Sequence, residues 1–191
     1  MQADINQMFI EHDIVPVLID KAPLVFAKVA YRSKLLVEAG KELTPTEVRD
    51  APKVEWDADP VVFYTLVMID PDSPSRTEPL NREFAHWLVG NIPGKHVEQG
   101  EVLFEYIPIF PRSTTGLHRY IFLLYQQNCR NDYSEAPRAS RKNRTPRVCF
   151  STRNFARRYS LGRPIAGNFF IAQFDEYVPI ILRQFPASDD F

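Results

Sequence analysis

The chain has 191 residues, of which 45% are hydrophobic and 13% aromatic, and a formal net charge of −1. This length is enough for one sizeable core, so we expect residues 1–191 to form a single domain. No apolar run approaches the roughly 18 residues of a membrane span, and the first residues lack the features of a signal peptide. With only Cys129 and Cys149, we expect no disulfide framework and a reduced, cytoplasmic location.

The charge is distributed unevenly along the chain. From Arg112 to Arg163, 12 Lys and Arg residues stand against two acidic residues, which gives a local charge of +10 and leaves −11 for the rest. The densest part, RASRKNRTPR at 138–147, has no apolar periodicity and is predicted to be an exposed loop. Such a segment indicates an anionic partner, such as phosphate, a lipid headgroup or an acidic protein face. A solvated arginine-rich loop explains it equally well.

Short extended segments dominate the chain in sequence order. Asp4 is predicted to cap a short helix, and the alternating apolar residues at 23–31 indicate a half-buried strand. Nearly continuous apolar runs, typical of strands covered on both faces, follow at 61–69, 101–110 and 118–127. A last strand is expected at 168–174. Two further short helices are predicted at 151–161 and from about Asp175.

Strands outnumber helices in this pattern and do not alternate with them. The pattern therefore favours a mainly β fold, a two-sheet antiparallel β-sandwich with a few short helices, over a βαβ fold.

Common active-site motifs are missing from the sequence. We find no G-x-S-x-G, no P-loop and no G-x-G-x-x-G. Asp70 and Asp72 match the start of a calcium loop, but its sixth and twelfth positions hold Ser75 and Asn81 in place of Gly and Glu. The close paired spacing of zinc ligands is also missing among Cys129, Cys149, His86 and His118. We therefore expect no metal or redox cofactor.

Polar residues gather instead at the ends of the predicted strands. Asp70 and Asp72 lie two residues apart, so an extended backbone aims both side chains the same way. His118 and Tyr120 share this spacing, and His86 lies between apolar neighbours. We expect these groups to form a small polar pocket at the mouth of the sandwich, walled by Phe84, Trp87 and Phe110.

The residue types of this pocket suit the binding of an anion. Histidines donate hydrogen bonds to phosphate or carboxylate oxygens, and a nearby Asp fixes their tautomer or raises their pKa. Because a carboxylate is a poor neighbour for phosphate, the aspartates are expected to hold a histidine or to receive an ammonium group. Taken singly, an Asp after a strand is more often a turn residue, and a buried His is more often a core residue.

Two segments, DPDSPS at 70–75 and GLHRY at 116–120, resemble the two sequence boxes of the phosphatidylethanolamine-binding protein family. Other segments resemble the family in the same order, among them LTPTEV (43–48), REFAHWLVGN (82–91) and PIAGNFF (164–170). The resemblance covers nearly the whole chain.

The resemblance implies a two-sheet β fold with a small pocket at one end for phosphate-like anions and phosphorylethanolamine headgroups. It implies a cis peptide bond before Pro74 and, by position, these pocket residues: Asp70, Asp72, His86, His118 and Tyr120, with Pro111 on the wall. Family members bind lipids or anions, and several inhibit kinases or serine proteases without a settled catalytic activity of their own.

The chain departs from the family pattern at four positions. Asn81 and Leu182 stand where tyrosines are common, Phe110 stands where a glycine is usual, and Arg112 replaces a proline. The ring of Phe110 is expected to narrow or plug the pocket, and Arg112 is expected to add charge for an anion.

We expect a cytoplasmic, monomeric, non-enzymatic protein that binds phosphate-like anions or phospholipid headgroups and modulates a signalling kinase. We expect no nucleic-acid partner and no transmembrane segment. The alternatives are a serine-protease inhibitor, an interaction module with a vestigial pocket that binds through the 138–147 loop, and a hydrolase, which is the weakest because no nucleophile motif is present.

Overall fold

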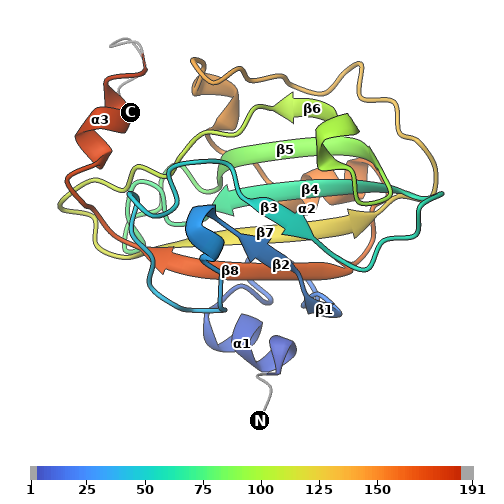
Figure 1. Ribbon diagram of the computed structural model, residues 1–191, viewed down its shortest axis with the longest axis horizontal. Coiled ribbons are helices and arrows are strands. Elements are labelled where there is room, and N and C mark those ends of the chain that lie inside the picture. Colours follow the sequence, from blue (N-terminus) through green and yellow to red (C-terminus); the bar gives the residue numbers. More distant parts are fainter. Residues whose placement is uncertain (1–3, 186–191) are drawn as a thin grey trace.

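The structure of the chain, a computed structural model, describes residues 4–185 (Figure 1). Its largest element is a six-stranded sheet in the order β1–β8–β7–β4–β5–β6. Neighbouring strands are antiparallel except for the parallel pair β1–β8. The strands of this sheet are β1 (Val25–Phe26), β4 (Phe63–Asp70), β5 (Phe84–Pro93), β6 (Glu101–Phe104), β7 (His118–Gln126) and β8 (Ala166–Ala172).

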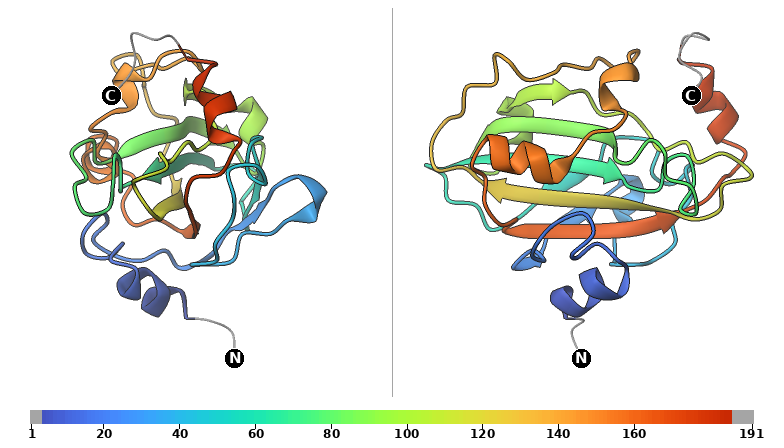
Figure 2. Two further views of the ribbon diagram at one scale, coloured as in Figure 1. Left: turned by 90° about the vertical axis from the view of Figure 1, so that its left-hand side faces the viewer. Right: turned by 180° about the vertical axis from the view of Figure 1, so that it is seen from behind.

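Smaller elements cover both faces of the large sheet. The two-stranded sheet of β2 (Lys28–Ala30) and β3 (Lys53–Glu55) lies over one face. Seen from behind, α2 (Thr152–Arg158) lies across the other face, with α1 (Ile5–Glu11) near the β8 edge (Figure 2). The third helix, α3 (Val178–Leu182), stands beyond the end of the sheet toward which β4 runs.

The apolar strands divide between two cores, one on each face of the large sheet. On β4, Val67 and Ile69 join the core under the helices, whereas Leu66 and Met68 join the core under the small sheet. Successive side chains of a strand point to opposite faces, so a strand between two cores must be apolar at every position. This explains the continuous apolar run of β4.

The predicted mainly β fold with two sheets and a few short helices is confirmed, although the two sheets are unequal and one edge pair is parallel. Asp4 caps α1 by accepting from the Asn6 N–H, and Ser151 caps α2 by accepting from the Asn154 N–H. The cis bond before Pro74 is also present. Within residues 4–185, no helix combines the length and the apolar character needed to cross a membrane.

One predicted strand was too long, and two strands, β3 and β5, were not predicted. The segment 101–110 pairs as a strand only through Phe104, and its remainder runs as an extended chain toward the end of the sheet. The longest strand, β5, was not predicted as a strand, and it carries His86. Its sequence, FAHWLVGNIP, includes a glycine and a proline, which are depleted in strands.

Candidate functional site

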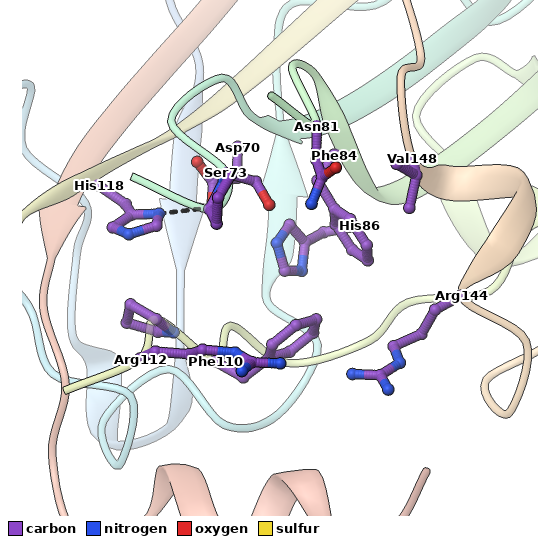
Figure 3. Close-up of a pocket in the computed structure, with 12 residues that line it drawn as sticks. Asp70, Ser73, Asn81, Phe84, His86, Phe110, Arg112, His118, Arg144 and Val148 are labelled. Carbon is purple, nitrogen blue, oxygen red and sulfur yellow. Dashed lines mark hydrogen bonds and ion pairs between the residues drawn. The ribbon is translucent and has the colours of Figure 1, made fainter. Parts of the chain in front are cut away.

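A pocket opens at the end of the large sheet where three neighbouring strands begin or end (Figure 3). Asp70 ends β4, His118 begins β7 and Phe84 begins β5. The pocket has a cavity volume of about 50 Å³, which is room for a few water molecules or one small anion at roughly 10–15 Å³ per water. Its lining residues are Asp70, Ser73, Pro74, Asn81, Phe84, His86, Phe110, Pro111, Arg112, His118, Arg144 and Val148.

Asp70 and His118 form a buried pair at one side of the pocket. The Nδ1 of His118 lies 2.8 Å from the Oδ2 of Asp70, and the Oδ1 of Asp70 accepts from the Asp72 N–H at 2.7 Å. Burial alone lowers the pKa of His118, but the charge of Asp70 and its hydrogen bond outweigh burial, so the pKa of His118 is raised.

The hydrogen bonds of Thr115 support a protonated His118. The Thr115 hydroxyl donates its one proton to the Arg112 carbonyl at 2.9 Å, so it accepts from the Nε2 of His118 at 2.8 Å. Both ring nitrogens of His118 are therefore donors, and its positive charge is balanced by Asp70.

A β-bulge positions His86. Ile69 pairs with Ala85 and Met68 pairs with Trp87, so His86 is an extra residue on β5 opposite β4. A bulge of this kind turns two successive side chains to the same face of a sheet and re-aims them. His86 consequently points into the pocket, as Figure 3 shows.

The His86 ring is enclosed by aromatic rings. The centroids of Phe84, Phe110 and Tyr120 lie 5.1, 5.7 and 5.5 Å from it. Its Nδ1 donates to the Ile107 carbonyl, 3.2 Å away, since a carbonyl can only accept. Burial lowers the pKa of His86 to about 3, so the imidazole is neutral at pH 7.

Arg147 fixes the bulge from behind. Its guanidinium, fully buried, donates to the carbonyls of Ala85 and His86 at 3.1 Å each. Four further carbonyls accept from the same guanidinium: Glu105, Ala139, Ser140 and Asn143. Burial lowers the pKa of Arg147 to about 10, so it stays charged at pH 7.

The predicted exposed loop at 138–147 is therefore only partly exposed. Arg138, Arg141 and Lys142 are exposed, but Arg144 and Arg147 are buried. Arg144 lines the pocket, with its guanidinium over the rings of Phe185 and Phe110 at 4.8 and 5.8 Å. Periodicity could not reveal these positions, because the rings under Arg144 and three of the six carbonyls around Arg147 come from distant segments.

Three of the four positions that depart from the family pattern line the pocket: Asn81, Phe110 and Arg112. Phe110 narrows the pocket without filling it, and its ring meets Phe84 and Phe185 at 5.5 Å each. Pro111 lies on the wall, as the resemblance implied. Leu182 is absent from the described lining, and Phe185, just beyond α3, contacts Phe110 instead.

The expectation that Asp72 faces the same way as Asp70 was wrong. Asp72 is fully buried. Its carboxylate accepts hydrogen bonds from the backbone N–H, the Nε and the Nη2 of Arg119, at 2.9, 2.8 and 2.6 Å. Arg119 also donates to the His12 carbonyl, next to α1. Alternation applies only within a strand, and β4 ends at Asp70, so the following turn carries Asp72 to another environment.

Tyr120 and Trp87 also lie outside the pocket lining. Tyr120 faces the same way as His118, as predicted, but it is buried behind it, with the two rings stacked at 6.3 Å. The placement of Trp87 on the pocket wall was wrong: it packs on Tyr106 at 5.6 Å and lines a separate groove with Trp56. Because of the bulge, Trp87 lies on the same face of the large sheet as His86, one residue further along β5.

Comparisons with known proteins agree with the fold. The chain is 35% identical over 180 residues to the Drosophila melanogaster protein named "Putative odorant-binding protein A5", covering 94% of this chain and 85% of that one. The structure named "CG7054 solution structure" is 45% identical, with a TM-score of 0.74 over 90% of this chain and 97% of that one. Carboxypeptidase Y inhibitor complexed with its cognate proteinase shares the fold, at 24% identity and a TM-score of 0.75 over 88% and 94% of the two chains.

A family model described as phosphatidylethanolamine-binding protein matches residues 33–170. This match spans well over half of the 191 residues and includes every residue that lines the pocket. The chain belongs to the phosphatidylethanolamine-binding protein family.

Proposed function

We propose that the pocket binds a small phosphate-like anion, free or as a phospholipid headgroup, and that the protein is a binding and regulatory module. The charge of the lining carries this proposal. Arg112 and Arg144 bring two positive charges, and Asp70, the one carboxylate among the described lining residues, is balanced by His118. A cavity of about 50 Å³ that two arginines line suits one anionic group.

Each polar group has a part in this proposal. Arg112 and Arg144 attract the anion, and the amide of Asn81 can donate or accept within the pocket. Asp70 can receive an ammonium group at the inner end. Asp72 and Tyr120, which we expected in direct contact with the ligand, support the site from behind instead.

The geometry favours a binding role over hydrolysis. Thr115, His118 and Asp70 lie in the order of a hydroxyl–histidine–carboxylate series. However, the hydroxyl donates to a carbonyl and accepts from His118, so this histidine holds no free lone pair with which to act as a base.

We further propose that anion binding tunes the interaction with a partner protein, first of all a signalling kinase. Inhibition of a proteinase is a second candidate, and the shared fold with carboxypeptidase Y inhibitor supports it. A cytoplasmic location and a monomeric state stay predictions. The two exposed free thiols of Cys129 and Cys149 support the first of these.

A matched pair of variants tests the proposal by calorimetric titration with phosphorylethanolamine. Arg112→Gln removes an exposed pocket charge, and we expect about tenfold weaker binding, as for the loss of one charged hydrogen bond. Lys142→Gln removes an exposed charge that does not line the pocket, and the affinity should be unchanged. Equal affinities of the wild type and Arg112→Gln would contradict the proposed role of the lining charge.

A further inference from the structure

We infer that a second cavity, at the C-terminal end of α2, binds a small amphipathic anion: a carboxylate or phosphate head group on a compact apolar body. This α2 cavity is lined by residues of 19–21 and 153–164 and by Tyr125 of β7. Its volume of about 430 Å³ falls within the roughly 300–1,000 Å³ of small-molecule sites.

The α2 cavity is separate from the pocket at the end of the large sheet. The two linings share no residue. Tyr125 lies near the end of β7 and His118 begins it, so the two sites are about 23 Å apart along the strand, at 3.3 Å per residue. Binding at one site can therefore be measured independently of the other.

Most charged side chains of the α2 cavity are positive. Its lining holds four cations and one carboxylate: Lys21, Arg153, Arg157, Arg163 and Asp20. Asp20 pairs with the Nε of Arg153 at 2.9 Å and with Arg157 at 3.5 Å. Arg163 donates to the Ala22 carbonyl at 2.6 Å, a neutral partner that leaves its charge in place. Within residues 4–185, neither Lys21 nor Arg163 forms an ion pair, and the lining keeps a balance of +3.

Tyr125 contributes a buried hydroxyl to this lining. The side chain is 1% exposed and belongs to the core under the helices. Burial raises the pKa of Tyr125 above its usual range, so the phenol keeps its proton and can donate it. In the described part of the chain this hydroxyl has no hydrogen-bond partner. Because buried polar groups nearly always have one, the hydroxyl indicates an acceptor from outside the chain.

Arg153 adds a second donor that the protein does not satisfy. Its Nε lies near Asp20, but the N–H is not aligned with that oxygen and has no other acceptor among residues 4–185. Three carbonyls in the last turn of α2, those of residues 155–157, already accept from the backbone N–H groups of residues 159–161. These carbonyls therefore place no unpaired acceptor against an anion.

The remainder of the lining explains why the ligand needs an apolar body. Three buried apolar side chains, those of Ile19, Ala156 and Pro164, lie beside the ring of Tyr125. An apolar group placed against them leaves water, which favours binding, whereas an inorganic anion gains nothing there. The pocket at the end of the sheet, with its volume of about 50 Å³, has no room for such a body.

Four probes test this inference on the full chain at pH 7: decanoate, decyl phosphate, decanol and acetate. Decanol lacks the charge and acetate lacks the apolar body. In calorimetric titrations, at least one of the two decyl anions should bind at least tenfold more tightly than either, and the tighter one identifies the head group. Amide shifts in ¹⁵N NMR spectra should centre on Ala156 and Gly162 rather than on His118.

Two variants test the residues that recognise the head group. Tyr125→Phe removes a hydroxyl that has no partner in the protein, so the fold should persist while the tighter decyl anion binds about tenfold more weakly. The double variant Lys21→Gln, Arg157→Gln should also lose about tenfold. The control Lys142→Gln, Arg158→Gln removes as many exposed charges outside the cavity, and its affinity should equal that of the wild type.

Four results would overturn the inference. They are decanol binding as tightly as both anions, equal affinities of the two double variants, amide shifts centred on His118, and no binding of either decyl anion. An unchanged amide spectrum away from the cavity shows that a variant is folded. Failure of phosphorylethanolamine to bind would count against the pocket alone, because the two sites share no residue.

Discussion

Asp70 and Asp72 stand on either side of one proline, yet they belong to two different regions of the molecule. Asp70 faces the pocket and pairs with His118, whose charge depends on a proton. Asp72 is buried away from the pocket, among three hydrogen bonds from Arg119, whose charge is permanent. The pocket side holds a titratable pair, whereas the region behind it holds charged groups that fix the backbone.

The same division separates the arginines of the 138–147 segment. Arg144 lies at the pocket beside Phe110, and Arg147 lies behind it with six backbone carbonyls. Charged residues close together in the sequence thus lie at the pocket or behind it according to where the chain turns. Changes on the two sides should therefore have separable effects on stability and on ligand binding.

The largest effect is expected from Asp72→Asn. This change leaves the guanidinium of Arg119 buried without its counter-charge, which typically costs about 3–5 kcal/mol. Urea denaturation monitored by tryptophan fluorescence should show this loss in the free energy of unfolding. A loss below about 1 kcal/mol would mean that the pair does not anchor the turn.

Glu83 is a third buried acid. Unlike Asp70 and Asp72, it accepts hydrogen bonds from neutral groups, the backbone N–H and the hydroxyl of Thr152. Burial raises the pKa of Glu83 to about 7, so the folded state binds a proton that the unfolded state releases near pH 4.5. The free energy of unfolding should consequently fall as pH rises from about 5 to 7, by up to about 3 kcal/mol.

Glu83→Gln should remove this slope. Unfolding free energies measured in denaturant at pH 5, 6, 7 and 8 check the difference between the variant and the wild type. Parallel pH profiles for the two proteins would contradict the raised pKa of Glu83.

Asp70→Asn should cost less stability than Asp72→Asn, about 1–2 kcal/mol, because His118 can lose its proton when its partner loses its charge. The direct effect is on the histidine, whose pKa should fall below that of the wild type. A pH titration of the His118 ring by NMR measures this shift. An unchanged pKa of His118 would show that the pair is not electrostatically coupled.

The smallest effect is expected from Trp87→Phe. Trp87 packs on Tyr106 outside the pocket, so the affinity for phosphorylethanolamine should change less than twofold. A tenfold change in this affinity would show that Trp87 contacts the ligand.

Much of the pocket could be predicted from sequence, because strand periodicity and the two family boxes place polar groups at strand ends. Asp70, His118, Phe84, Phe110 and Pro111 all line it, as expected. The fold class followed from the same apolar runs, which become strands covered on both faces.

The remaining features depend on contacts between distant segments. The bulge that aims His86 is set by pairing with β4, and no local pattern in FAHWLV encodes it. The position of Asp72 depends on where β4 ends, and a shift of a residue there changes the face to which a side chain points. Three of the six carbonyls that hold Arg147 belong to other segments, so the polar sequence around it does not predict that it is buried.

The most direct measurement is a titration of the ¹⁵N-labelled protein with phosphorylethanolamine at pH 6 and pH 8, following His86 and His118 by NMR. We predict saturable shifts of both histidines, with tighter binding at pH 6. The absence of shifts at both pH values would contradict a working anion pocket and would direct attention to protein partners of the exposed residues Arg141 and Lys142.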